Sequence, residues 1–199
     1  MDAEIKIKAS PSVADPSRCT FTVDRPVFEN RAFYFTPDRA SGSPLAQQIL
    51  AVKGVDAVLI SHDTLTVIAD GYPDWRVIGR EIGAAIREVL SSGRPAVSDE
   101  VMENLLPPEK IRAVVQQVLD TQINPTVAMH GGTVRLIDVQ GNNVYIEMAG
   151  GCQGCGMADV TLRSGVERSI REFVPEVGDI LDVTDHASGR NPYYQSSGR

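Results

Sequence analysis

Apolar and polar residues alternate in several short runs of the N-terminal half, and this period of two predicts β-strands. Strands are expected over residues 19–23 and 32–35, and the β-branched runs 55–60 and 64–69 predict a hairpin. Residues 1–16 are polar, contain two prolines and are expected to be frayed.

Apolar residues three or four positions apart predict two helices in the same half of the chain. Ser43 is expected to cap the first helix, with Pro44 at its first position. Asp74 is expected to cap the second, in which an apolar stripe follows residues 75–90. These strands and helices predict a small α+β domain over residues 17–92.

The C-terminal half shows the same two patterns, alternation for strands and steps of three or four positions for helices. A helix is predicted from Pro108, and two alternating runs, 134–139 and 144–148, predict a β-hairpin. Apolar residues spaced for a helix follow over residues 162–173, and a last short strand is expected over residues 180–184.

The region between the two halves, residues 93–107, carries no long periodic pattern and is expected to be a semi-rigid linker. The predicted fold class is therefore α+β, with two small α+β domains joined by a linker. Their expected bounds are 17–92 for the first domain and 108–186 for the second, with a tail over residues 187–199.

The most informative stretch is the glycine-rich turn 150–156, which carries Cys152 and Cys155 between a strand pattern and a helix pattern. Two cysteines in a CxxC motif can direct both sulfurs at one centre, and the glycines allow a close approach of the backbone. This arrangement supplies half of a four-ligand metal or cluster site. If four thiolates bind one cluster, two chains must each contribute Cys152 and Cys155.

Composition narrows the classes of function. A net charge of −7 argues against binding to nucleic acid or to an anionic membrane, and no apolar run is long enough to span a bilayer. The first residues lack the pattern of a signal peptide, so a cytoplasmic protein is expected. Three cysteines do not make a disulfide framework. No catalytic triad or carboxylate pair stands out in the sequence, so the protein is not expected to be an enzyme.

Other roles for the same residues remain open from the residues alone. Cys152 and Cys155 suit a thiol–disulfide oxidoreductase or a structural zinc half-site as well as a cluster. Cys19 is expected to be a half-buried strand residue, and Trp75 a core anchor. For His130, before two glycines, a hydrogen-bonded loop histidine is favoured over a transient iron ligand.

A larger ordered set of motifs resembles a known family. These motifs resemble the C-terminal domain of NifU-like (Nfu/NfuA-type) iron–sulfur cluster carriers over residues 108–186: Ile123-Asn124-Pro125, His130-Gly131-Gly132, Gly151-Cys152-Gln153-Gly154-Cys155, Asp159-Val160-Thr161-Leu162 and Val174-Pro175-Glu176-Val177. Residues 17–90 resemble the N-terminal domain of Nfu scaffold proteins more loosely, through motifs around Ser43, Gly54, Thr64 and Asp74.

The resemblance implies a specific function. In such carriers a [4Fe-4S] cluster bridges two subunits through the CxxC motif, so it implies that Cys152 and Cys155 are the ligands in a homodimer. It further implies that the cluster comes from an upstream assembly scaffold and passes to apo iron–sulfur client proteins. The N-terminal domain is then expected to dock targets or tune the dimer geometry.

Overall fold

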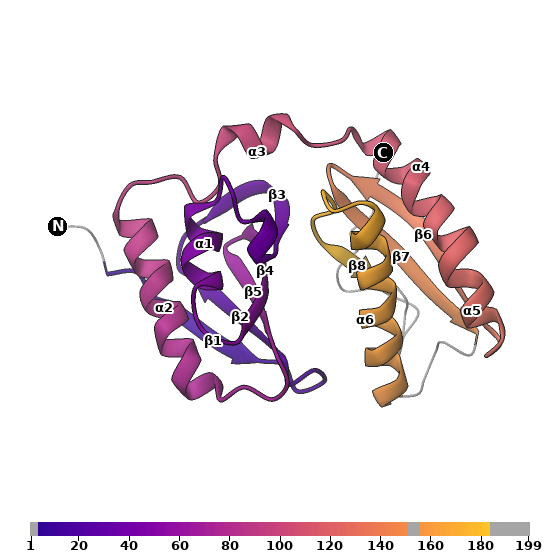
Figure 1. Cartoon of the computed structure of the whole chain (residues 1–199), viewed down its shortest axis with the longest axis horizontal. Helices are drawn as coiled ribbons and strands as arrows, with labels where there is room; N and C mark the ends of the chain where they lie inside the picture. The colour runs from indigo at the N-terminus through magenta and orange to yellow at the C-terminus, as the bar shows by residue number, and fades with distance from the viewer. Residues whose placement is uncertain (1–3, 151–155, 184–199) are drawn as a thin grey trace. The chain divides into compact units, whose positions relative to one another are not determined.

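The computed structural model describes residues 4–150 and 156–183 of the protein. The chain divides into two compact units, Met1–Leu105 and Leu106–Arg199 (Figure 1). Each unit has its own cluster of buried apolar side chains. Both units combine helices with a sheet, which confirms the predicted α+β fold class.

The first unit is built on a five-stranded sheet in the order β1-β2-β5-β4-β3, and all of its neighbouring strands are antiparallel. Along β2 and β5 every second residue is buried, as expected for a sheet with one face toward a core. The strands are β1 (Ile7–Pro11), β2 (Arg18–Val23), β3 (Phe28–Phe35), β4 (Val55–His62) and β5 (Thr64–Ala69).

Strand β1 corrects the expectation that residues 1–16 are frayed. Its five residues pair in register with β2, from Ile7 opposite Val23 to Pro11 opposite Cys19. As an edge strand, β1 leaves four of its five side chains exposed, so it lacks the apolar alternation of a half-buried strand. Proline is tolerated at its end because an edge residue need not donate to a ladder.

Two helices supply the rest of the first core, α1 (Pro44–Leu50) and α2 (Trp75–Ser91). The predicted caps are confirmed, because the Ser43 hydroxyl accepts the Ala46 N–H at 3.0 Å and the Asp74 carboxylate accepts the Arg76 N–H at 2.9 Å. The apolar stripe of α2 packs with inward residues of the sheet in one buried cluster. Trp75 packs against this cluster, and its indole N–H bonds the Pro16 carbonyl at 2.9 Å.

The segment after α2 also packs on the first unit. Ala96 and Val97 are buried in its core, and the short helix α3 (Asp99–Glu103) follows them. The Ser98 N–H donates to the Gly42 carbonyl at 2.8 Å. The boundary between the two units therefore falls after α3, between Leu105 and Leu106.

The second unit contains a three-stranded sheet in the order β6-β7-β8. Strands β6 and β7 form the predicted antiparallel hairpin, whereas β7 and β8 are parallel and are connected through α6. Parallel neighbours need such a crossover, so the chain must leave one end of β7 and return along a helix. The elements are α4 (Pro108–Val118), a π-helical turn (Leu119–Ile123), α5 (Asn124–Ala128), β6 (Gly132–Gln140), β7 (Asn143–Gly150), α6 (Gly156–Phe173) and β8 (Ile180–Asp182).

Helices α4 and α6 provide the apolar cover of this sheet. Ile111 and Val115 of α4 and Ile170 of α6 are fully buried with Ile146 and Met148 of β7 in one cluster. The Arg171 guanidinium donates to the carbonyls of residues 177 and 178, both at 2.7 Å, which holds the end of α6 against the turn before β8. Strand β7 and the C-terminal half of α6 are therefore well packed.

Candidate functional site

The two cysteines predicted to bind a cluster fall in the connection between β7 and α6. Strand β7 ends at Gly150 and helix α6 begins at Gly156, while Cys152 and Cys155 lie outside the described residues. The connection follows the carboxyl end of β7, the strand of the β7-α6-β8 unit from which the chain crosses over. Open sheets containing parallel strands commonly bind ligands at such strand ends.

The hairpin holds one end of this connection. Gly132 pairs with Gly150 at the last position of the β6/β7 ladder, so the turn before β6 is adjacent to the start of the connection. That turn closes through the His130 N–H on the Val127 carbonyl at 3.0 Å, and Gly131 takes a φ of +70°. A left-handed φ is open to glycine without the Cβ penalty of other residues. The turn is thus built by backbone bonds and a glycine.

Helix α6 holds the other end. It runs for 18 residues from Gly156, with Val166 and Ile170 buried, so its first turn follows Cys155 directly. The N-terminus of a helix carries free N–H groups and partial positive charge, both of which stabilise thiolates and a negatively charged cluster. Among the described side chains of α6, Arg163 pairs with Glu167 at 3.2 Å.

No further metal ligands gather in the described residues. Across residues 4–150 and 156–183 there is no group of three or more His, Cys, Asp or Glu side chains that could hold a metal ion. His130 is exposed and lies on the turn before β6, and His62 has a φ of +43° at the end of β4. The described part of one chain therefore holds no ready-made group of ligands that could complete a site with Cys152 and Cys155.

Cys19 has a different environment. It lies on β2 with none of its surface exposed, more deeply buried than predicted, and burial raises the pKa of its thiol above the usual value. A buried neutral thiol is a poor nucleophile and a poor metal ligand. Cys19 therefore serves the core of the first unit.

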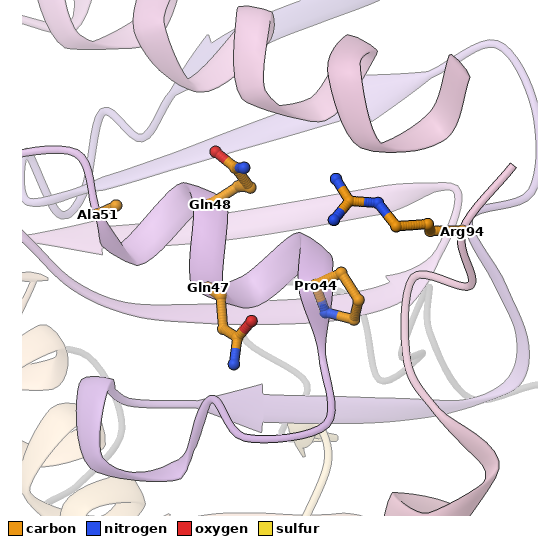
Figure 2. A pocket seen from close by; sticks show the side chains of 5 residues that line it. All are labelled: Pro44, Gln47, Gln48, Ala51 and Arg94. Carbon is orange, nitrogen blue, oxygen red and sulfur yellow. The ribbon is translucent and has the colours of Figure 1, made fainter. Parts of the chain in front are cut away.

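A hollow of about 210 Å³ on the first unit is lined by no side chain that commonly binds a metal (Figure 2). It lies beside α1, and the Arg94 side chain extends toward this helix from the segment after α2. The Arg94 Nε–H bonds the Ser92 hydroxyl at 3.2 Å. Side-chain amides and a guanidinium offer polar contacts but no thiol, imidazole or carboxylate. The lining residues are Pro44, Gln47, Gln48, Ala51 and Arg94.

Fold and site together define a class of protein: a chain of two α+β units, the second of which presents a CxxC pair between a strand and a helix. Two family models match these units. The model described as "Scaffold protein Nfu/NifU N terminal" matches residues 5–93, and the model described as "NifU-like domain" matches residues 115–181.

Individual relatives agree with the family models. The human protein named "NFU1 iron-sulfur cluster scaffold homolog, mitochondrial" is 31% identical over 179 residues, which cover 87% of this chain and 70% of the human one. "Fe/S biogenesis protein NfuA" of Pseudomonas aeruginosa is 48% identical over 81 residues, 40% of this chain and 42% of that protein. The chain therefore belongs to the Nfu family.

A solved structure is also similar. The solution structure of a NifU-like protein from Saccharomyces cerevisiae covers 49% of this chain and 90% of its own, with a TM-score of 0.44 and 23% sequence identity. Among the described residues, no helix is long and apolar enough to cross a membrane.

Sequence reasoning missed the side chain that holds the hairpin at the start of the site. Asn124 was recognised only as part of a family motif, yet its side-chain amide bonds both the N–H and the carbonyl of Val134. The π-helical turn before it was not predicted. An Asn-Pro pair inside a helical pattern signals a local break, but it does not reveal the strand edge that the side chain meets.

Proposed function

We propose that the protein is an iron–sulfur cluster carrier that binds a [4Fe-4S] cluster between two copies of the chain and transfers it to apo-proteins. The observation that carries this proposal is family membership across both units, combined with a CxxC motif placed between β7 and α6. The cluster is cargo, so the protein is not proposed to be an enzyme.

The ligand count supports a homodimer. A [4Fe-4S] cluster takes four thiolates, and one chain offers Cys152 and Cys155 at this place. Cys19 is buried in the other unit, and the described residues contain no cluster of other ligands. Two copies related by a two-fold axis would supply four equivalent thiolates.

Transfer then proceeds by ligand exchange. Each client thiolate forms a bond to an iron while one Cys152 or Cys155 thiolate leaves, so the cluster moves with no change of its oxidation state. Because two chains share the cluster, loss of the cluster also removes the bridge between them. The partners in this proposal are an upstream assembly scaffold and apo iron–sulfur clients, with no nucleic acid and no membrane.

The cytoplasm is the compartment we propose, because exchangeable thiolates need a reducing environment. The human relative is named as mitochondrial, and that compartment suits the same chemistry. Localisation of the tagged full chain by microscopy or fractionation in its own cells separates the two.

Anaerobic loading with iron and sulfide tests the proposal. Wild-type protein is expected to become a brown dimer with about four irons per two chains. Cys152→Ser and Cys155→Ser are each expected to abolish loading, whereas the matched control Cys19→Ala should load like the wild type because its thiol is buried. Loading that survives both loop substitutions contradicts the proposal.

The same sample distinguishes the second use of a CxxC motif. A thiol–disulfide oxidoreductase would remain a colourless monomer and would show a reversible Cys152–Cys155 disulfide in a redox titration. Metal analysis that finds zinc in place of iron would indicate a zinc half-site.

A further inference from the structure

Asn124 binds the open edge of strand β6 through its side chain. Its Oδ1 accepts the Val134 N–H at 2.8 Å, and its Nδ2 donates to the Val134 carbonyl at 3.0 Å. The Thr133 hydroxyl lies 3.3 Å from the same Oδ1. With one donor and one acceptor matched to the same backbone residue, the orientation of the amide is defined.

This contact completes the ladder at one position of an edge strand. Val134 pairs with Met148 of β7 on its inner side, and β6 is the outer strand of the order β6-β7-β8. The N–H and carbonyl that point away from β7 at an edge strand would otherwise need water. The Asn124 amide therefore acts as a one-residue extension of the sheet.

The π-helical turn directs Asn124 to this edge. Leu119–Ile123 forms the turn directly before α5, and both Leu119 and Ile123 are buried in the core. A π-turn inserts an additional residue into a helix and rotates the side chains that follow it. The turn thus allows Ile123 to face the core while the next side chain, Asn124, reaches β6.

The Asn124 contact lies next to the end of the hairpin from which the cysteine connection starts. Gly132 and Gly150 form the last pair of the ladder, two residues beyond the pair of Val134 with Met148. Neither glycine has a side chain to pack, and the Asn124 contacts with Thr133 and Val134 restrain β6 directly beside this pair.

We propose that Asn124 is a positioning residue for Cys152 and Cys155: it holds the β6/β7 end so that the cysteine connection leaves from a fixed point. The inference rests on the proposed cluster-carrier function. A connection with anchored ends loses less conformational entropy when its thiolates bind a cluster, so the anchor strengthens cluster retention. Asn124 does not contact the cluster in this proposal.

The chain offers a matched control at the opposite end of the same hairpin. The Asn143 Oδ1 accepts the Asp179 N–H at 2.9 Å, and Asn143 pairs with Gln140 at the turn end of the ladder. Asn143→Ala removes one side-chain to backbone hydrogen bond, where Asn124→Ala removes two, and this bond lies far along β7 from Gly150. A purely structural loss should therefore lower the stability of both variants without singling out the peptides at residues 148–156.

Hydrogen exchange on the apo full-length protein is the first readout. Asn124→Ala is expected to raise exchange about five- to tenfold in peptides covering residues 132–134 and 148–156, the lower range for the loss of two net hydrogen bonds. Asn143→Ala should leave these peptides unchanged. Equal exchange of the two variants over residues 148–156 overturns the positioning role, whether or not a cluster binds.

Cluster retention is the second readout. After anaerobic loading, Asn124→Ala is expected to lose iron to a chelator about fivefold faster than Asn143→Ala, because only the Asn124 bonds lie next to the start of the cysteine connection. Identical rates would overturn the inference while leaving the carrier function intact, whereas a wild type that takes up no iron would reject the carrier function alone.

A second variant covers the case in which Asn124→Ala fails to fold. Asn124→Asp keeps the acceptor for the Val134 N–H and loses the donor to the Val134 carbonyl. Exchange over residues 148–156 is expected to fall between the wild type and Asn124→Ala. Wild-type exchange and retention in this variant would contradict the inference.

Discussion

The two units place cysteine at different positions in the fold, although both pack helices against a sheet. In the first unit Cys19 lies inside strand β2, fully buried, with the pKa of its thiol raised by burial. In the second unit Cys152 and Cys155 follow the end of β7 and precede the first turn of α6. Position in the fold, rather than the residue type, decides whether a thiol packs or reacts.

Under the proposed carrier function, the comparison predicts that the first unit can be weakened without loss of cluster binding. Leu65 of β5 and Ile146 of β7 are both buried, and truncating either to alanine is expected to cost about 2–5 kcal/mol in its own unit. Leu65→Ala should leave iron loading unchanged, whereas Ile146→Ala should reduce it. Fluorescence of Trp75, the chain's single tryptophan, follows unfolding of the first unit, and cluster absorption follows the second.

Loss of loading in Leu65→Ala would break this comparison, because it would show that the two units are energetically coupled. Both variants should be measured at a temperature where the wild type is fully folded. Iron content per chain, rather than colour alone, then separates weaker binding from a smaller folded fraction.

Two glycines of the first unit allow a second test, of how tightly the segment after α2 packs on this unit. Gly42 has a φ of +86°, and a Cβ there would lie 2.5 Å from Val101 Cγ2, whereas Gly54 has a φ of +88° with nothing within 4 Å. Alanine at either position is expected to cost about 1–2 kcal/mol for the left-handed backbone. Gly42→Ala should cost about 1–3 kcal/mol more, because Val101 must shift.

Denaturant unfolding of Gly42→Ala and Gly54→Ala, followed by Trp75 fluorescence, measures the difference. Equal destabilisation would show that α3, which carries Val101, contributes little to the first unit. Loading of iron should remain at the wild-type level in both variants.

The contact of Gly42 with Val101 also illustrates what sequence patterns predict and what they miss. The hairpins, the caps at Ser43 and Asp74 and the helix after the cysteines follow from short-range periods and capping chemistry, and the structure confirms them. Packing of residues 96–102 on the first unit depends on partners more than fifty positions away, which a local pattern does not contain.

The candidate site was likewise predictable from the sequence only in part. Its place between a strand and a helix was predicted from the alternating pattern before residues 150–156 and the helix pattern after them, and the bounds of β7 and α6 agree with that placement. The ligand role of Cys152 and Cys155 stays a prediction. The contact of Asn124 with β6 was not predicted, because it depends on β6 being the edge strand of the sheet. Strand order is not contained in the local sequence pattern.

Helix capping provides a smaller test within the first unit. The buried Ser43 hydroxyl caps α1 and donates to the Ala96 carbonyl at 2.7 Å, whereas Asp74 is exposed and caps α2 through Arg76. Ser43→Ala is expected to cost about 1–2 kcal/mol because a buried carbonyl also loses its partner, and Asp74→Ala about 0.5–1 kcal/mol. Thermal unfolding followed by circular dichroism measures both, and the reverse order would contradict the role of the Ala96 bond.

Two carboxylates of the second unit are expected to act on stability with opposite signs. Burial raises the pKa of Asp179, and the nearby Arg171 only partly offsets it. The Gln140 side chain lowers the pKa of Asp138, with further help from the Val139 N–H and Arg112. The folded state therefore favours the protonated form of Asp179 and the charged form of Asp138.

The sign follows from proton linkage. For Asp179 the folded state binds the proton more tightly, so its contribution to stability is present at acid pH and is lost as pH rises from the usual Asp value toward the raised pKa. For Asp138 the contribution is present above the usual value and is lost as pH falls through the lowered pKa. At neutral pH Asp179→Asn is thus expected to raise the free energy of unfolding and Asp138→Asn to lower it. Urea unfolding of both variants between pH 3 and 7 should show each difference shrinking toward acid, and a stabilising effect of Asp138→Asn at neutral pH would contradict the assignment.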